Sequence, residues 1–382
     1  MSTPSPRPPR QEAQPASHEV TEVAPGVLRM QLPITMPGLG HVNCYALEDE
    51  RGLAVVDPGL PGPPTWRAIN DRLRQVGAKP RHVHTVIVTH SHPDHFGSAA
   101  KLRSAAGAEV VTHRSFRTWL DPDEETNPDA VDASDADAPG ALGDPTDAGP
   151  GATTDADGTR NGGRRTSRPF SPLDGKLPWR DAEVAPPPRR LGNPIRRRLM
   201  RRWMRAPGPT RRLEDAEVIT LAGREWVAVH TPGHTHDHLC LLDPAEGLLL
   251  AGDHVLPTIT PHVSGLAAGA DPLANFLASL DKVRELTGVR LVLPAHGHPF
   301  DDLVGRVDAI HRHHRERLDA IHRATAEAGR ATVEVVTQQV FHPRSWGQMA
   351  ESETYAHLEH LRRQGRVMVD DQGPALVYEV AG

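Results

Sequence analysis

Apolar residues recur along the chain in short runs whose spacing predicts alternating strands and helices. Runs with the length and β-branched content of strands occupy residues 27–34, 43–48, 52–57, 84–90 and 108–113. Two stretches with helical spacing, residues 66–76 and 98–106, follow the third and the fourth of these runs. Strands followed by βαβ units predict a sheet with helices on its outer face.

A second set of apolar runs begins after residue 213 and repeats this arrangement. Strand-like runs occupy residues 217–223, 224–230, 237–243, 247–255 and 289–297, and a helix is expected at residues 273–286. The two sets therefore predict an α/β domain over residues 19–300.

Two segments interrupt or precede this pattern. Residues 1–18 contain Pro, Ser and charged residues without apolar periodicity, and we expect a disordered tail. An insert at about residues 121–212 is acidic and rich in Pro, Gly and Ala in its first part and basic in its second. Within the basic part, residues 195–205 could form one helix, read either as a solvated helix on a loop or as a lid or patch for an acidic ligand.

The last part of the chain, residues 301–382, predicts a different small domain. A long helix is expected at residues 302–328, followed by helices at 333–340 and 351–364. A hairpin of two strands with QG between them completes the chain. This order is typical of a winged-helix unit.

Composition narrows the class of protein. The formal net charge is −6 and 24% of residues are charged, so the chain offers no general attraction to nucleic acid or to anionic lipid. No apolar run is long enough to cross a membrane, and the first twenty residues lack the apolar segment of an export signal, which predicts a cytoplasmic protein. Cys44 and Cys240 are too few for a disulfide framework and lie in apolar runs.

Histidines and aspartates follow the predicted strands at the positions where strands end. The strand at residues 84–90 leads into HSHPDH, and three later strands each end in one further ligand-type residue. These seven side chains are His90, His92, Asp94, His95, His234, Asp253 and His296. Imidazole and carboxylate ligands in this number leave room for two divalent metal ions, for which zinc is expected and iron or manganese are alternatives.

With this motif, the chain resembles the metallo-β-lactamase-fold hydrolases. His90, His92, Asp94 and His95 match the HxHxDH motif of that family, while NCY at 43–45 and VVDPG at 55–59 resemble its opening strands. The branch near glyoxalase II and the lactamase-like-2 proteins is the most similar. The resemblance implies a four-layer αββα sandwich with a small C-terminal helical or winged-helix-like domain.

The resemblance also implies how the ligands divide between two metals. His90, His92 and His234 would hold one metal, Asp94, His95 and His296 the other, and Asp253 would bridge both. Hydroxide formed between the metals would then attack an ester, thioester or lactone. Asp94 is a further candidate as proton acceptor and His254 as proton donor.

Several residues and functions stay open at this point. Asp57 and His238 are candidates for orienting a ligand, and His262 is a second candidate proton donor or a surface residue. A metal-dependent ribonuclease acting on single-stranded RNA is one alternative function, and a persulfide-dioxygenase-like oxidoreductase with one iron is another. The expected partner is a small-molecule substrate; nucleic acid is not favoured, and a homodimer is compatible with the sequence.

Overall fold

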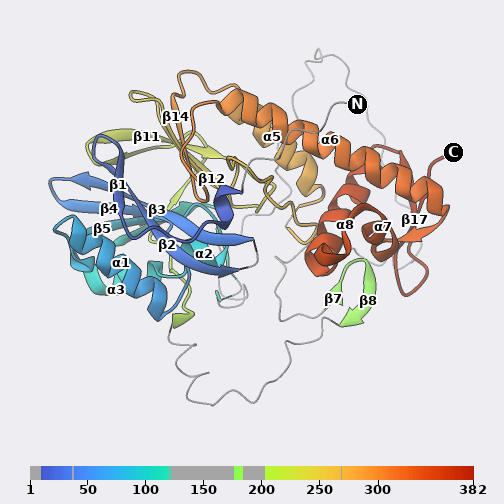
Figure 1. Ribbon diagram of the computed structural model, residues 1–382, viewed down its shortest axis with the longest axis horizontal. Helices are drawn as coiled ribbons and strands as arrows, with labels where there is room; N and C mark the ends of the chain where they lie inside the picture. Colours follow the sequence, from blue (N-terminus) through green and yellow to red (C-terminus); the bar gives the residue numbers. More distant parts are fainter. Residues whose placement is uncertain (1–9, 37, 119, 122–175, 184–202, 268) are drawn as a thin grey trace, which may run out of the picture.

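The computed structural model describes residues 10–36, 38–118, 120–121, 176–183, 203–267 and 269–382. A seven-stranded sheet forms one half of its centre, in the order β1-β2-β3-β4-β5-β6-β9. Figure 1 labels its strands β1 to β5. Its strands are β1 (Val20–Ala24), β2 (Val27–Met36), β3 (Leu39–Asp49), β4 (Gly52–Val56), β5 (Val83–Ile87), β6 (Glu109–His113) and β9 (Arg211–Leu213). Strands β4, β5, β6 and β9 are parallel, as expected for βαβ units.

A five-stranded sheet forms the other half, in the order β10-β11-β12-β13-β14. Its strands are β10 (Val218–Leu221), β11 (Arg224–His230), β12 (Leu239–Asp243), β13 (Leu248–Gly252) and β14 (Leu291–Pro294). The edge strand β14 runs parallel to β13, and α5 (Pro272–Arg284) connects them.

Alternating side chains bind the layers together. In β4, Leu53 and Val55 pack toward the helices α1 (Pro63–Gln75) and α3 (Ala99–Ala106), whereas Ala54 and Val56 pack toward the second sheet. In β13 the same alternation places Leu248 and Leu250 between the sheets and Leu249 and Ala251 against α5 and α6 (Leu303–Ala328). The order of layers is therefore helices, sheet, sheet, helices, which confirms the predicted αββα architecture.

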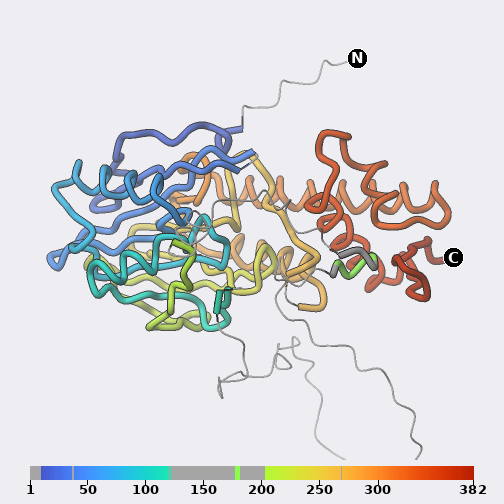
Figure 2. The backbone as a smooth tube through the Cα atoms, turned by 90° about the horizontal axis from the view of Figure 1, so that it is seen from below, coloured from blue at the N-terminus to red at the C-terminus, as the bar shows by residue number. Residues whose placement is uncertain are grey.

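Beyond the sandwich, α6 extends into a smaller C-terminal unit, seen at one end of the molecule in both views (Figure 2). The unit adds β15 (Ala331–Thr332), α7 (Val333–Val340), α8 (Gln348–Arg363), β16 (Val367–Asp370) and β17 (Val377–Val380). The helices lie close to their predicted positions, and the final hairpin pairs with β15 in a three-stranded sheet. The winged-helix assignment and the domain limits 19–300 and 301–382 stay predictions.

Part of the insert belongs to this C-terminal unit. A hairpin of β7 (Lys176–Leu177) and β8 (Arg180–Glu183) carries Trp179, which is only 2% exposed. The Trp179 indole donates a hydrogen bond to Glu351 of α8 at 3.0 Å, and its carbonyl accepts one from the backbone of Leu376 at 3.0 Å. Most of the predicted basic helix at 195–205 lies outside the described residues, which begin again at residue 203.

The N-terminal segment differs from the expected tail. Residues 1–9 lie outside the described part, but Gln11–Ala13 form a short 3-10 helix whose Glu12 is fully buried. One Glu12 carboxylate oxygen accepts hydrogen bonds from the backbone of Thr258 at 2.8 Å and Ile259 at 3.1 Å. The expectation of disorder is therefore wrong for residues 10–18, because polar anchoring rather than apolar burial orders them.

Among the described residues, the remaining short helices are α2 (Pro93–Phe96) and the 3-10 turns at Pro80–His82 and Pro343–Ser345. Helix α6, with 26 residues, carries charged residues along its length. Within the described part of the chain, no helix combines the length and the apolar character needed to cross a bilayer.

Candidate metal centre

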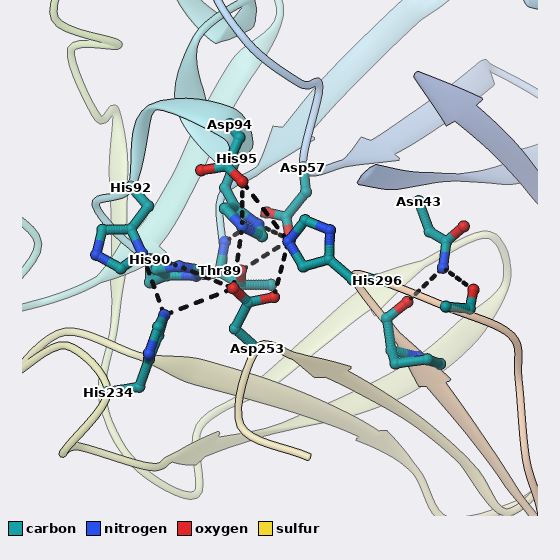
Figure 3. A network of polar contacts seen from close by, with 12 residues as sticks. Asn43, Asp57, Thr89, His90, His92, Asp94, His95, His234, Asp253 and His296 are labelled. Carbon is teal, nitrogen blue, oxygen red and sulfur yellow. Dashed lines mark hydrogen bonds and ion pairs between the residues drawn. The ribbon is translucent and has the colours of Figure 1, made fainter. Parts of the chain in front are cut away.

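The ends of four strands bring the seven predicted ligand residues together (Figure 3). His90 follows β5, His234 follows β11, Asp253 follows β13 directly and His296 follows β14. His92, which directly precedes α2, and Asp94 and His95, which lie within it, come next to these strand ends. This convergence is what the spacing of the residues in the sequence predicts.

One group consists of His90, His92, His234 and Asp253, whose ligand-type atoms lie within 4.8 Å of one another. His92 Nδ1 lies 3.0 Å from His90 Nε2 and 3.1 Å from His234 Nε2. Asp253 Oδ2 lies 3.5 Å from His234 Nε2 and 3.9 Å from His90 Nε2. Three imidazole nitrogens and one carboxylate oxygen therefore face a single point.

A second group consists of Asp94, His95 and His296, again within 4.8 Å of one another. Asp94 Oδ2 lies 3.6 Å from His95 Nε2 and 3.6 Å from His296 Nε2. Asp253 reaches this group as well: its Oδ2 lies 3.5 Å from His95 Nε2 and its Oδ1 lies 3.3 Å from His296 Nε2. Asp253 thus stands between the two groups.

The chemistry of these atoms fits divalent metal ions. His95 Nε2, His296 Nε2 and Asp253 Oδ1 are buried, and although they lie 3.3 to 3.5 Å from a polar atom of the centre, none makes a well-oriented hydrogen bond within the protein. Buried polar atoms without a partner are costly unless they bind something else. Burial lowers the pKa of His92 to about 3 and that of His90 well below its ordinary value. Both imidazoles are therefore neutral and have a lone pair to offer.

Side chains and carbonyl groups behind the centre orient three of the imidazoles. His95 Nδ1 lies 2.9 Å from Asp57 Oδ2, His296 Nδ1 lies 2.7 Å from the carbonyl of His41, and His234 Nδ1 lies 2.7 Å from the carbonyl of His262. A partner on Nδ1 fixes the tautomer and directs Nε2 toward the centre. Asp57 has the supporting position that the sequence suggested.

His238 supports Asp253 from behind. Its Nε2 accepts a hydrogen bond from the backbone N–H of Asp253 at 3.0 Å, and Thr231 Oγ1 lies 2.7 Å from its Nδ1. Gly252 has a φ of +50°, and a Cβ atom there would lie 2.6 Å from His238 Nε2. Glycine is therefore required for Asp253 to turn into the centre.

His254, predicted as a proton donor, lies outside both groups. Its ring is fully buried and packs against Phe276, with the ring centroids 5.1 Å apart. Burial lowers its pKa to about 3. A neutral, enclosed imidazole keeps one N–H but is a very weak acid, and the donor role stays a prediction that the geometry does not support.

Other supporting residues were missed in the sequence. His41 and His262 act on the ligands through their backbone carbonyls, which every residue possesses, so no side-chain signal marks them. Asn43 donates hydrogen bonds to the carbonyls of Pro294 and Gly297, both at 2.8 Å, and thereby holds the turn around His296. Its place in the NCY motif was the one signal that pointed to it.

Comparisons with known proteins agree with this arrangement. Residues 37–296 match the family model described as the metallo-beta-lactamase superfamily. Solved structures of a metallo-beta-lactamase family protein from Thermus thermophilus and a beta-lactamase domain protein from Burkholderia ambifaria are similar. They have 26% and 25% identity, each with a TM-score of 0.67, and the matches cover 94% and 97% of this chain and 100% and 97% of theirs.

Curated relatives align over shorter segments. An atrochrysone carboxyl ACP thioesterase from Aspergillus novofumigatus is 30% identical over 33% of this chain and 40% of its own length. The beta-lactamase-like protein 2 homolog of Caenorhabditis elegans is 30% identical over 35% of this chain and 43% of its own length. Both alignments therefore span less than half of the relative.

Proposed function

Because this chain belongs to the metallo-beta-lactamase superfamily, we propose that it is a metal-dependent hydrolase that cleaves a small thioester, ester or lactone. The observation that carries the proposal is the position of Asp253, whose two carboxylate oxygens face the two groups of histidines. Such an arrangement suits two divalent cations, with zinc first and iron or manganese as alternatives.

The proposal gives each residue of the centre a separate role. His90, His92 and His234 would hold one cation and Asp94, His95 and His296 the other, and Asp253 lies close enough to both groups to contribute to each. Bound cations supply Lewis-acid chemistry, since they acidify water and stabilise negative charge on a carbonyl oxygen. Asp94 is also the carboxylate proposed to accept the proton of the attacking water, since it lies at the centre itself. Asp57 keeps His95 oriented throughout.

A thioester is the favoured substrate within this class. Relatives from Aspergillus novofumigatus and Aspergillus terreus are named atrochrysone carboxyl ACP thioesterases. The ribonuclease and single-iron oxidoreductase alternatives stay open, but no described contact favours either. The basic helix that motivated the ribonuclease lies largely outside the described residues.

The proposal is tested by metal analysis and a substrate panel. Purified protein should carry two divalent ions and hydrolyse thioesters or lactones, and His92→Ala should lower kcat/KM by orders of magnitude. RNA cleavage that is abolished by a chelator would favour the ribonuclease. Oxygen uptake by a protein with one iron per chain would favour the oxidoreductase. His92→Ala with unchanged metal content and rate would contradict the assignment altogether.

A further inference from the structure

The loop that orients His234 is held from outside the sandwich. The carbonyl that lies 2.7 Å from His234 Nδ1 belongs to His262, in the loop between β13 and α5. The corresponding partners of His95 and His296 are Asp57 and the carbonyl of His41, which both belong to the seven-stranded sheet or directly follow one of its strands. His234 therefore depends on a segment that needs separate support.

Helix α8 of the C-terminal unit supplies that support through its first turns. Ser264 Oγ lies 2.9 Å from Ser352 Oγ, and the backbone of Gly265 donates to the Ser352 carbonyl at 3.2 Å. A Cβ atom on Gly265 would lie 2.5 Å from the ring of Tyr355 and 2.9 Å from the Ser352 carbonyl. The loop backbone is thus seated directly on the helix, at a distance that only glycine permits.

Glu353, on the same turn of α8, reaches His262 itself. Its Oε2 lies 3.6 Å from His262 Nδ1, and its Oε1 lies 3.9 Å from Arg317 of α6. Burial opposes ionisation of this carboxyl group, but His262, His357 and Arg317 outweigh it and lower its pKa to about 2. Glu353 is consequently a carboxylate at neutral pH and can attract His262 and Arg317 together.

We propose that Glu353 is a positioning residue for the metal centre: acting through His262, α8 orients His234 and so sets the metal affinity of the His90, His92, His234 and Asp253 group. The proposal rests on the proposed function, because it assumes that this group binds a metal ion. The effect on metal affinity should be selective, because the group of Asp94, His95 and His296 has its own orienting partners in the seven-stranded sheet.

The experiment measures metal affinity rather than turnover. Metal-free protein is titrated with Zn²⁺ against a chromophoric chelator, and with Co²⁺ for its absorption spectrum, in the wild type, Glu353→Gln and Glu359→Gln. Glu359 is the matched control: it lies on the same helix, but it accepts hydrogen bonds from Tyr378 and Arg362, away from the loop. We expect Glu353→Gln to weaken one of two equivalents about tenfold, as for other orienting residues.

Two backgrounds identify the affected group. His296→Ala leaves the first group intact, so adding Glu353→Gln should still weaken the remaining equivalent. His92→Ala damages the first group, so adding Glu353→Gln should change nothing further. His262→Ala combined with Glu353→Gln should weaken the affinity less than the sum of the single effects, because both act through one contact. Urea unfolding of each variant shows that it remains folded.

The outcomes separate the two proposals. Equal affinities in the wild type and Glu353→Gln, equal weakening of both equivalents, or the same effect from Glu359→Gln would overturn the positioning role while leaving the hydrolase proposal intact. A folded wild-type protein that binds no divalent metal would overturn both. Gly265→Ala, which forces the loop off α8 without removing any charge, should reproduce the selective effect of Glu353→Gln.

Discussion

Asp57 Oδ2 lies 2.9 Å from His95 Nδ1, and both side chains are almost completely buried. The other oxygen of Asp57 accepts a hydrogen bond from the backbone of Thr89 at 2.8 Å. Asp57 directly follows β4, and Thr89 follows β5, so one carboxylate joins two strand ends beneath the metal centre. Its φ of +53° lies in the left-handed region, where Asp and Asn are tolerated better than most residues.

The first prediction concerns Asp57→Asn. Asparagine keeps the backbone conformation but replaces one accepting oxygen by an amide donor, so His95 or Thr89 loses its partner. We expect the affinity of the Asp94, His95 and His296 group for Zn²⁺ to fall about 10- to 100-fold, measured by chelator competition.

Asp243→Asn is the matched control for that change. Asp243 is also fully buried and accepts hydrogen bonds, from Arg224 and from a turn, but it lies at the end of β12, away from the ligands. Asp243→Asn should change stability without changing metal affinity. An Asp57→Asn protein that binds both equivalents as tightly as the wild type would show that Asp57 only supports the turn.

Most of the sandwich could be predicted from the sequence because its strands are nearly continuous apolar runs. The predicted run at residues 52–57 corresponds to β4 (Gly52–Val56), buried on both faces. By contrast, β1 (Val20–Ala24) and β9 (Arg211–Leu213) were missed. These edge strands are short and half-exposed, so their polar residues hide the pattern.

The meeting of the seven candidate ligands was also predictable, because histidine and aspartate that follow several apolar strands come together at one edge of the fold. The supports behind them were not. The position of the His262 carbonyl depends on how its loop packs, through Ser264, against the distant helix α8. This packing of the loop against α8 arises from tertiary structure, and it cannot be predicted from the spacing of residues in one sequence.

Trp179 provides a prediction about the insert. Its ring is buried against the C-terminal unit and lies 5.2 Å from the ring of Tyr355, centroid to centroid. Trp179→Ala should lower the free energy of unfolding by about 3 to 5 kcal/mol, the usual cost of removing a buried large aromatic side chain. Trp179→Phe keeps most of the buried area and loses the hydrogen bond to Glu351, so about 1 kcal/mol is expected. Urea unfolding measures both, and equal values for Trp179→Ala and the wild type would show that the hairpin contributes nothing.

A buried pair of histidines predicts how stability depends on pH. His314 Nδ1 lies 3.2 Å from His357 Nε2, between α6 and α8. Burial lowers the pKa of His357 to about 4 and that of His314 to about 2, although Glu353 opposes this effect and Arg317 and His313 add to it. Both groups bind protons more readily when unfolded, so stability should fall as the pH drops below about 6.5.

His314→Phe tests this relationship. Removing one such group should make the decline between pH 6.5 and pH 5 shallower by about 1.1 kcal/mol per pH unit on average. The measurement is urea unfolding at several pH values. The control is His18→Phe, because His18 is exposed and lies in the N-terminal segment, far from His314 in the sequence. An unchanged slope in His314→Phe would mean that acid sensitivity arises elsewhere.

Removing metal should destabilise the folded protein. Without cations, the centre holds buried polar atoms that lack partners, among them His95 Nε2 and His296 Nε2, and such groups cost free energy in the folded state alone. A ligand that binds only the folded state adds about 4 kcal/mol when its concentration is a thousand times its Kd. Chelator should therefore lower the Tm, and Zn²⁺ should restore it, in differential scanning calorimetry.

The control is a protein carrying both His92→Ala and His296→Ala, which damages both groups and should melt at the same temperature with or without chelator. If the wild type behaved like that control, the two groups would not be metal sites, and the proposed hydrolase would lose its foundation.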